Sequence, residues 1–220
     1  QTGYGECISS YKIPFSSRSI DYNENGDSAL KLMDEFRVYH LAVTNKKKYL
    51  GVISENEILN WDKSSENINS HTDKLIQSSV RFSQHLFDII QEVEKYSLSI
   101  IPVLNEKNDY LGAITNRRLL YTIAKSTAIQ SIGGVIVLKI KHNDYHMSEI
   151  ARIIESNNAK ILSSYITSES EMEYIEVTIK LNKINITSIV KDFERFNYII
   201  SASYNKIDQN IDLTDRYESL

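Results

Sequence analysis

Two stretches of this chain repeat nearly the same phrase. Residues 49–59 read YLGVISENEIL and residues 110–120 read YLGAITNRRLL. Gly51 and Gly112 hold the same place in the phrase, 112 − 51 = 61 positions apart. An internal match of this kind is typical of folds made of repeated units, because each unit covers an apolar face that the other would leave open. The sequence therefore predicts two similar units in tandem.

The similarity extends upstream of both phrases. Residues 27–45 and 87–105 each begin with apolar residues at helical spacing and continue into a short run typical of a β-strand. A polar turn follows, which in the first copy contains the three lysines at 46–48 and is predicted to be a hairpin tip. A second strand and a short amphipathic helix complete each copy. The predicted order in each unit is helix, strand, strand, helix.

These paired units resemble tandem CBS domains, an arrangement called a Bateman module. Met33 to Val43 and Gly51 to Ser54 carry the resemblance in the first copy. Ile101 to Val103, which includes Pro102, and Gly112 to Thr115 carry it in the second. The resemblance implies the CBS fold for both copies. Pro102 and Val103 are apolar and are predicted to lie in the core, with contact to a ligand in a cleft as the alternative.

A new pattern begins after Gly133 and Gly134. Two predicted helices, at 147–158 and near Ile186 to Phe193, alternate with strand-like runs in the order β-α-β-β-α-β, which is the ferredoxin-like plan. A unit of this kind behind a CBS pair resembles an ACT domain. An antiparallel sheet covered by helices on one face leaves an open face or edge, so we expect this unit to dimerise.

The predicted fold class is therefore α/β (α+β), a tandem CBS pair followed by a ferredoxin-like βαββαβ domain of ACT type. The whole layout resembles the acetoin-utilisation accessory type of CBS protein. Residues 1–6 are left out of the prediction, because the chain starts with Gln1 and not with Met. The predicted boundaries are a first repeat at 8–60, a connector at 61–79, a second repeat at 80–128, an ACT-like domain at 133–205 and a flexible tail at 206–220.

Composition excludes several classes of partner. Lys and Arg number 25 against 29 Asp and Glu, for a net charge of −4, whereas nucleic-acid binders normally carry a basic face. Cys7 is the single cysteine, so no intrachain disulfide forms, which fits a reducing compartment. No apolar run approaches the roughly 20 residues that cross a membrane. We predict a cytoplasmic protein with no nucleic-acid or membrane partner.

The resemblance implies a ligand site in each repeat. In nucleotide-binding CBS pairs, a hydroxyl residue reaches phosphate or ribose, and an aspartate three positions later accepts the ribose hydroxyls. These positions fall on Ser54 and Glu57 in the first repeat and on Thr115 and Arg118 in the second. Glu57 keeps the acceptor chemistry with one more methylene, whereas the guanidinium of Arg118 only donates and suits a phosphate or carboxylate. The alternative is that either hydroxyl caps the helix that follows it.

The implied regulatory ligands are AMP, ADP, ATP or S-adenosylmethionine, and no cofactor is certain. For the third unit, amino-acid-binding ACT domains carry D-x-x-G at the first strand–helix turn. Here Asn143 to Met147 contains no glycine, which argues against an amino-acid site. Asp144 is predicted to cap the following helix, because Asp ahead of a helix is more often a cap, and contact with a ligand amine is the alternative.

No catalytic or metal-binding constellation is visible. His142 and His146 are four residues apart, but His142 falls at the predicted strand end and no HExxH pattern is present. Tyr39, His40 and His85 fall at helix–strand junctions and are predicted to pack or cap. We predict a non-catalytic regulatory homodimer that senses an adenine nucleotide or related phosphate-bearing metabolite and conveys this to an unidentified protein. The alternative, favoured by the loss of the ribose aspartate in both repeats, is a ligand-free dimeric scaffold or interaction protein.

Overall fold

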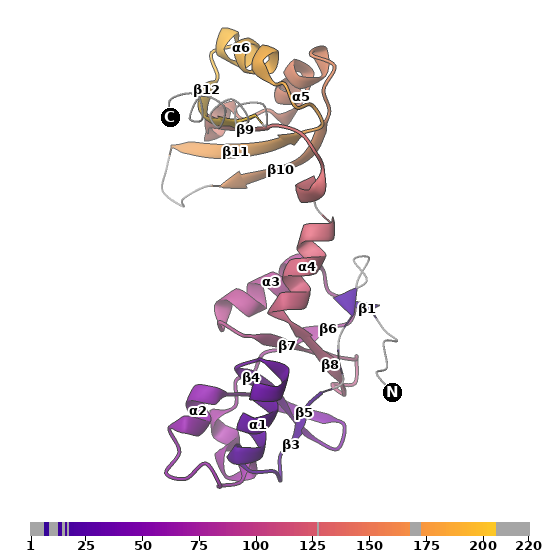
Figure 1. The fold of residues 1–220 in the computed structure, drawn as a ribbon, viewed down its shortest axis with the longest axis vertical. Coiled ribbons are helices and arrows are strands. Elements are labelled where there is room, and N and C mark those ends of the chain that lie inside the picture. The colour runs from indigo at the N-terminus through magenta and orange to yellow at the C-terminus, as the bar shows by residue number, and fades with distance from the viewer. Residues whose placement is uncertain are drawn as a thin grey trace, which may run out of the picture. The chain divides into compact units, whose positions relative to one another are not determined.

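The computed structural model divides the chain into two compact units, residues 1–126 and 127–220 (Figure 1). Each unit is considered by itself. The predicted flexible tail at 206–220 lies outside the described residues. The structure describes residues 7–8, 13–14, 16, 18–126, 128–167 and 173–205.

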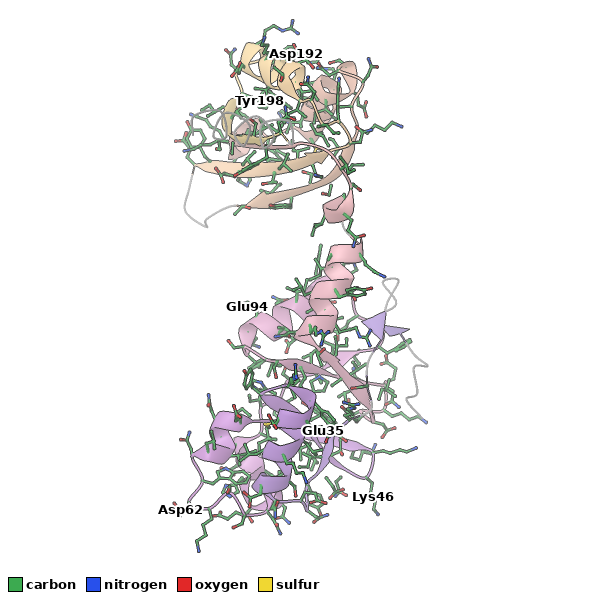
Figure 2. All side chains as sticks on the ribbon, in the orientation of Figure 1. Glu35, Lys46, Asp62, Glu94, Asp192 and Tyr198 are labelled. Carbon is green, nitrogen blue, oxygen red and sulfur yellow. The ribbon has the colours of Figure 1, made fainter. Side chains whose placement is uncertain are left out.

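The first repeat is a β-α-β-β-α unit. Its elements are β3 (Ile20–Asp21), α1 (Gly26–Phe36), β4 (His40–Asn45), β5 (Lys48–Ser54) and α2 (Glu55–Leu59). Strand β3 runs parallel to β4, and β4 runs antiparallel to β5. The predicted helix–strand–strand–helix order is confirmed, and so is the lysine-rich hairpin tip, where Lys46 has φ 59° (Figure 2). A strand ahead of the helix was not predicted, because two residues are too short to show a hydrophobic period.

The second repeat has the same topology. Its elements are β6 (Val80–Arg81), α3 (Leu86–Lys95), β7 (Ile100–Leu104), β8 (Tyr110–Thr115) and α4 (Asn116–Ser126). Strand β6 runs parallel to β7, and β7 runs antiparallel to β8. Ahead of the first repeat, β1 (Cys7–Ile8) pairs with β2 (Ile13–Pro14).

The register of the strand pairs is also the same in the two repeats. Gly51 pairs with Val43, and Gly112 pairs with Val103. Each hairpin then shows a register shift at the next residue of the first strand. A bulge kept in both copies shows that the repeated phrase encodes one local structure twice.

The two repeats of the first unit share their cores. Ile100 and Ala113 of the second repeat are buried in the first core, and Val52 of the first repeat is buried in the second core. Pro102 and Val103 are buried in β7, as predicted. Neither repeat therefore covers its own apolar surface completely, which is the physical reason for their pairing.

The segment predicted as a connector packs against the first repeat. Trp61 and Ile68 belong to the first core, with 9% and 0% of their surface exposed. The Trp61 ring stacks on His71 with centroids 3.9 Å apart, at the 3₁₀ helix η1 (Ile68–Lys74). Because these apolar residues are isolated among polar ones, sequence periodicity gave no sign of their burial.

The second unit has the predicted ferredoxin-like order. A four-stranded antiparallel sheet has the strand order β10-β11-β9-β12, and α5 and α6 lie on one side of it (Figure 1). Its core is built from alternate strand residues and the inner faces of both helices. The expected fold class is therefore confirmed. The elements are η2 (Ala128–Gln130), β9 (Val135–Lys141), η3 (His142–Asp144), α5 (Met147–Ser156), β10 (Ile161–Thr167), β11 (Tyr174–Leu181), α6 (Thr187–Arg195) and β12 (Ile199–Tyr204).

Among the residues described, no helix combines the length and apolar character that a membrane crossing requires.

Candidate functional site

A cavity of about 630 Å³ lies between the two repeats of the first unit and is called the inter-repeat cleft here. Its wall is formed by the end of α1 and the start of β4, by the turn between α3 and β7, and by the junction of β8 with α4. Its volume is within the range of small-molecule sites. The lining residues are Arg18, Glu35, Phe36, Arg37, Val38, Tyr39, His40, Ser97, Leu98, Ser99, Thr115, Asn116 and Arg117.

The charge of the inter-repeat cleft favours an anion. Arg18, Arg37 and Arg117 all line it and are all exposed, whereas Glu35 is the only acidic residue among the described residues of its lining. The Arg18 guanidinium lies 4.0 Å from the centroid of the Phe36 ring, which holds it over an aromatic face. Guanidinium groups bind phosphate and carboxylate through paired hydrogen bonds. A phosphate-bearing molecule therefore fits this lining.

Hydrogen bonds tie the two repeats together in the wall of the inter-repeat cleft. The Tyr39 amide donates to Ser99 Oγ at 2.9 Å, and the Ser99 amide donates to His40 Nδ1 at 3.2 Å. His40 Nδ1 also lies 3.1 Å from Ser99 Oγ. Burial lowers the pKa of His40, which favours the neutral ring whose Nδ1 accepts these bonds. The predicted packing role of His40 is thus confirmed, and it joins one repeat to the other.

The structure brings Thr115 and Arg118 together at the start of α4. Thr115 lines the inter-repeat cleft, and its Oγ1 accepts the Arg118 amide at 3.3 Å. Arg118 lines a different cavity of about 730 Å³ along α4, together with Thr115, Arg117, Leu120, Tyr121 and Ala124. Arg117, which lines both cavities, was missed by the sequence reasoning. Its place beside Arg118 in the repeated phrase was the signal that could have found it.

Ser54 and Glu57 occupy the matching place in the first repeat. Ser54 is the N-cap of α2, and its Oγ accepts the Glu57 amide at 3.1 Å. Glu57 Oε1 accepts the indole N–H of Trp61 at 3.4 Å. Neither residue lines the inter-repeat cleft or the cavity along α4. Both candidate hydroxyls therefore cap helices, which is the alternative role weighed from the sequence.

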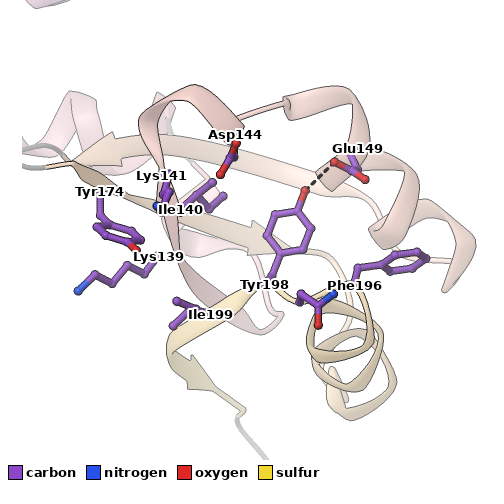
Figure 3. Close-up of a pocket in the computed structure, with 10 residues that line it drawn as sticks. Lys139, Ile140, Lys141, Asp144, Glu149, Tyr174, Phe196, Tyr198 and Ile199 are labelled. Carbon is purple, nitrogen blue, oxygen red and sulfur yellow. Dashed lines mark hydrogen bonds between the residues drawn. The ribbon is translucent and has the colours of Figure 1, made fainter.

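Asp144 lines a cavity of about 310 Å³ in the second unit (Figure 3). The prediction that it caps the following helix is wrong. Because η3 ends at Asp144 and α5 begins at Met147, the N-cap is His146, which makes no side-chain capping bond. The other lining residues are Lys139, Ile140, Lys141, Glu149, Tyr174, Phe196, Asn197, Tyr198 and Ile199.

A hydrogen bond joins two of the residues that line this cavity of the second unit. Tyr198 Oη donates to Glu149 Oε2 at 3.1 Å, as the dashed line in Figure 3 shows. Burial, and then this bond to Glu149, raise the pKa of Tyr198 to about 12. The phenol therefore stays protonated and donates at neutral pH.

The histidines outside these cavities have structural roles or no shared site. His85 is the N-cap of α3, as predicted, with its side chain accepting the Phe87 amide at 3.2 Å. His142 lies in η3 and His146 ahead of α5, so they do not share one helical face. Within the part of the chain that the structure describes, no group of three or more His, Cys, Asp or Glu residues could hold a metal ion.

Solved structures with a similar chain path include several CBS proteins. A CBS domain pair/ACT domain protein from Thermotoga maritima matches 57% of this chain and 93% of its own at 12% identity, with a TM-score of 0.44. CBSX2 in complex with AMP matches 50% of this chain and 88% of its own at 19% identity, with a TM-score of 0.43. CbpB from Streptococcus agalactiae matches 51% of this chain and 75% of its own at 21% identity, with a TM-score of 0.40.

A comparison with protein families gives a more direct result. Residues 17–64 match the family model described as the CBS domain. This range contains β3, α1, β4, β5 and α2, the complete first repeat. The first repeat is therefore similar to the CBS domain over residues 17–64.

Proposed function

We propose that this protein is a non-catalytic, cytoplasmic regulator that binds an adenine nucleotide or a related phosphate-bearing metabolite in the inter-repeat cleft. The observation that carries the proposal is a cavity of about 630 Å³, lined by both repeats, with three arginines and one carboxylate among the described residues of its wall. The choice of an adenine compound rests on the similarity of residues 17–64 to the CBS domain and on the motif positions of the second repeat. AMP, ADP, ATP and S-adenosylmethionine are the ligands to test.

The lining residues suit different parts of such a ligand. Arg18 and Arg117 would bind phosphate oxygens, because guanidinium groups pair with them at well-defined geometry. Thr115 Oγ1 already accepts the Arg118 amide, so its hydroxyl proton stays available for a phosphate or ribose oxygen. Tyr39 lines the cleft with 66% of its surface exposed and offers an aromatic face to a base.

The remaining candidate residues have separate proposed roles. Arg118, which stands beside Thr115, would reach a phosphate that extends toward α4. Ser54 and Glu57 would contact a second ligand in the first repeat. Asp144 would meet a ligand amine in the cavity of the second unit, where Lys141 and Tyr198 are its neighbours in the wall.

Regulation would follow from the position of the cleft between two repeats. A ligand that contacts both repeats favours the arrangement in which the Tyr39–Ser99 and Ser99–His40 bonds are formed. We propose that the protein acts as a homodimer on an unidentified target, with the second unit as an ACT-like module. The acetoin-utilisation accessory type is the layout that this proposal follows.

A thermal-shift panel with AMP, ADP, ATP and S-adenosylmethionine tests the proposal. At least one ligand should raise the melting temperature of the first unit, because binding to the native state stabilises it by mass action. Arg18→Ala and Thr115→Val should reduce the shift. Lys31→Ala, which removes an exposed cation of α1 outside the cleft, is the matched control and should keep it. A flat panel for the unmodified protein would contradict nucleotide sensing.

A ligand-free dimeric scaffold is the second candidate function. The observation that favours it is the structural use of the motif side chains, since Ser54 and Thr115 cap helices and Glu57 bonds to Trp61. It predicts a melting temperature that is indifferent to every nucleotide. The same panel therefore separates the two functions.

A further inference from the structure

Two short segments of the first unit cross from one repeat to the other. In the described part of the chain, the first crossing segment consists of Ser16, Arg18 and Ser19, and it leads into β3 of the first repeat. The second crossing segment consists of residues 76–79 and leads into β6 of the second repeat. Both segments therefore end at the short parallel strand that begins a repeat.

Each crossing segment begins with a backbone pair on the sheet of the opposite repeat. The Ser16 amide donates to Ala113 O at 3.1 Å, and the Ala113 amide donates to Ser16 O at 2.8 Å. The Ile76 amide donates to Val52 O at 2.8 Å, and the Val52 amide donates to Ile76 O at 2.9 Å. Ala113 lies in β8 of the second repeat, and Val52 lies at the equivalent place in β5 of the first, 113 − 52 = 61 positions earlier. The chain thus crosses between the repeats twice with the same pairing.

The tyrosine that opens the repeated phrase binds the backbone of each crossing segment. Tyr110 Oη donates to Arg18 O at 2.6 Å, and Tyr49 Oη donates to Ser78 O at 2.5 Å. Arg18 and Ser78 each lie two residues before their parallel strand. Burial raises the pKa of both phenols, so both stay protonated and donate at neutral pH. Each tyrosine belongs to one repeat, and the strand that its segment enters belongs to the other.

The two segments carry different side chains at the position that the tyrosine binds. The Arg18 guanidinium lies 4.0 Å from the centroid of the Phe36 ring and lines the inter-repeat cleft. Ser78 is only 3% exposed, and its Oγ donates to Glu92 Oε2 at 2.6 Å. Ser78 does not line the inter-repeat cleft. The same backbone arrangement therefore presents a cation to the cleft from the first segment and a buried hydroxyl from the second.

The backbone of Arg18 is fixed on both sides as well as at its own carbonyl. Ser16 is paired with β8 on one side, and on the other side Ser19 Oγ lies 3.1 Å from Oγ1 of the buried Thr44. The Arg18 side chain itself is exposed. Ordering a long side chain opposes binding, and a fixed starting point reduces the freedom that is lost. Anchoring the backbone therefore favours the capture of an anion by this guanidinium.

We propose that Tyr110 is a positioning residue for the anion in the inter-repeat cleft, because it holds the backbone of Arg18 where the guanidinium lines the cleft. This inference deepens the proposed function and rests on it. Tyr110 does not line the cleft itself, so it acts through Arg18. Tyr49 makes the equivalent bond to a segment without an arginine, and its role is confined to joining the repeats.

Calorimetric titration of the full chain with AMP, ADP, ATP and S-adenosylmethionine tests the inference. Tyr110→Phe should weaken binding of the ligand that the unmodified protein takes up by about fivefold, as expected for one lost hydrogen bond. Tyr49→Phe is the matched control, because it loses the same kind of bond, and it should keep the affinity of the unmodified protein. Both variants keep the aromatic ring, so both should fold, and their melting temperatures without ligand should fall by similar amounts.

A double-mutant cycle separates positioning of the guanidinium from a general loosening of the repeats. In the Arg18→Ala variant, Arg37 and Arg117 still line the cleft, and Tyr110→Phe should cost no further affinity because it acts only through Arg18. An equal loss with and without Arg18, or an equal loss in Tyr49→Phe and Tyr110→Phe, would overturn the inference and leave the proposed function standing. Absence of binding of all four ligands to the unmodified protein would overturn both.

Discussion

At the scale of single residues, the protonation state of His40 affects the contact between the two repeats. Its Nδ1 accepts the Ser99 amide, which requires that this nitrogen carry no proton. Burial lowers the pKa of His40, because the charged form of the ring would lose its contact with water. The residue belongs to one repeat and its partner to the other, so its protonation acts on the contact between them.

The first unit should therefore lose stability in mild acid. Above pH 6.5 His40 is neutral in the native and the unfolded chain. Below pH 6.5 the unfolded chain binds a proton that native His40 resists, so the free energy of unfolding falls as pH falls through the native pKa. His40→Asn keeps an acceptor oxygen that does not titrate and should reduce this loss. Fluorescence of Trp61, the only tryptophan and part of the first core, measures it.

The matched control for the pH prediction is His146→Asn, an exposed position in the second unit. This variant should leave the acid unfolding of the first unit as it is in the unmodified protein. If His40→Asn unfolds in acid along the same curve as the unmodified protein, the Ser99 contact does not carry the pH dependence.

At position 133, the neighbouring backbone leaves no room for a side chain. Gly133 has φ 159°, and a Cβ built on it would lie 1.8 Å from the carbonyl oxygen of Leu181. Gly133→Ala should therefore destabilise the second unit by at least about 2 kcal/mol, because backbone must move to make room. Urea unfolding followed by circular dichroism measures this loss. The Trp61 fluorescence transition should stay in place, and the exposed neighbour change Ser131→Ala should have little effect on either signal.

At the scale of elements, the first residues of α2 and α4 show how one hydroxyl residue can both cap a helix and contact a ligand. Ser54 and Thr115 accept amide protons from the residue three positions later, as capping residues do. Both positions are also those that the CBS resemblance assigns to ligand contacts. A hydroxyl can do both, because its oxygen accepts while its proton donates.

Helix α3 is held at its start by a reciprocal cap. The His85 side chain accepts the Phe87 amide, and Asp88 Oδ2 accepts the His85 amide at 3.0 Å. Asp88→Ala should cost about 1 kcal/mol of first-unit stability, measured by urea unfolding with Trp61 fluorescence. Glu94→Ala, an exposed carboxylate later in the same helix, is the control (Figure 2). Equal losses in both variants would show that helix charge, and not the cap, is responsible.

At the scale of the whole molecule, two units with separate cores should respond separately to a ligand. The inter-repeat cleft lies entirely within residues 1–126. A nucleotide at 100 times its dissociation constant should stabilise the first unit by about 2.7 kcal/mol and leave the second unit unaffected. Calorimetry should show one transition that moves and one that stays. A joint movement of both transitions would mean that the units unfold as one.

The sequence alone determined the order of the longer elements and the existence of the repeat, whereas the short strands β3 and β6 were not predicted. These features depend on local hydrophobic periods and on turn residues such as Lys46, which has φ 59°. The motif positions also led to Thr115, which does line the inter-repeat cleft. Local rules are sufficient here because helices, hairpins and caps are made by residues a few positions apart.

Only the tertiary structure decided how the candidate site is assembled. Arg18 and Arg117 lie 117 − 18 = 99 positions apart, and no period or motif connects them. The tertiary structure also placed Asp144 in a cavity wall instead of at a helix cap, because the turn η3 intervenes. Long-range packing brings such residues together. The polar residues that line the inter-repeat cleft meet only when the apolar surfaces of both repeats cover each other.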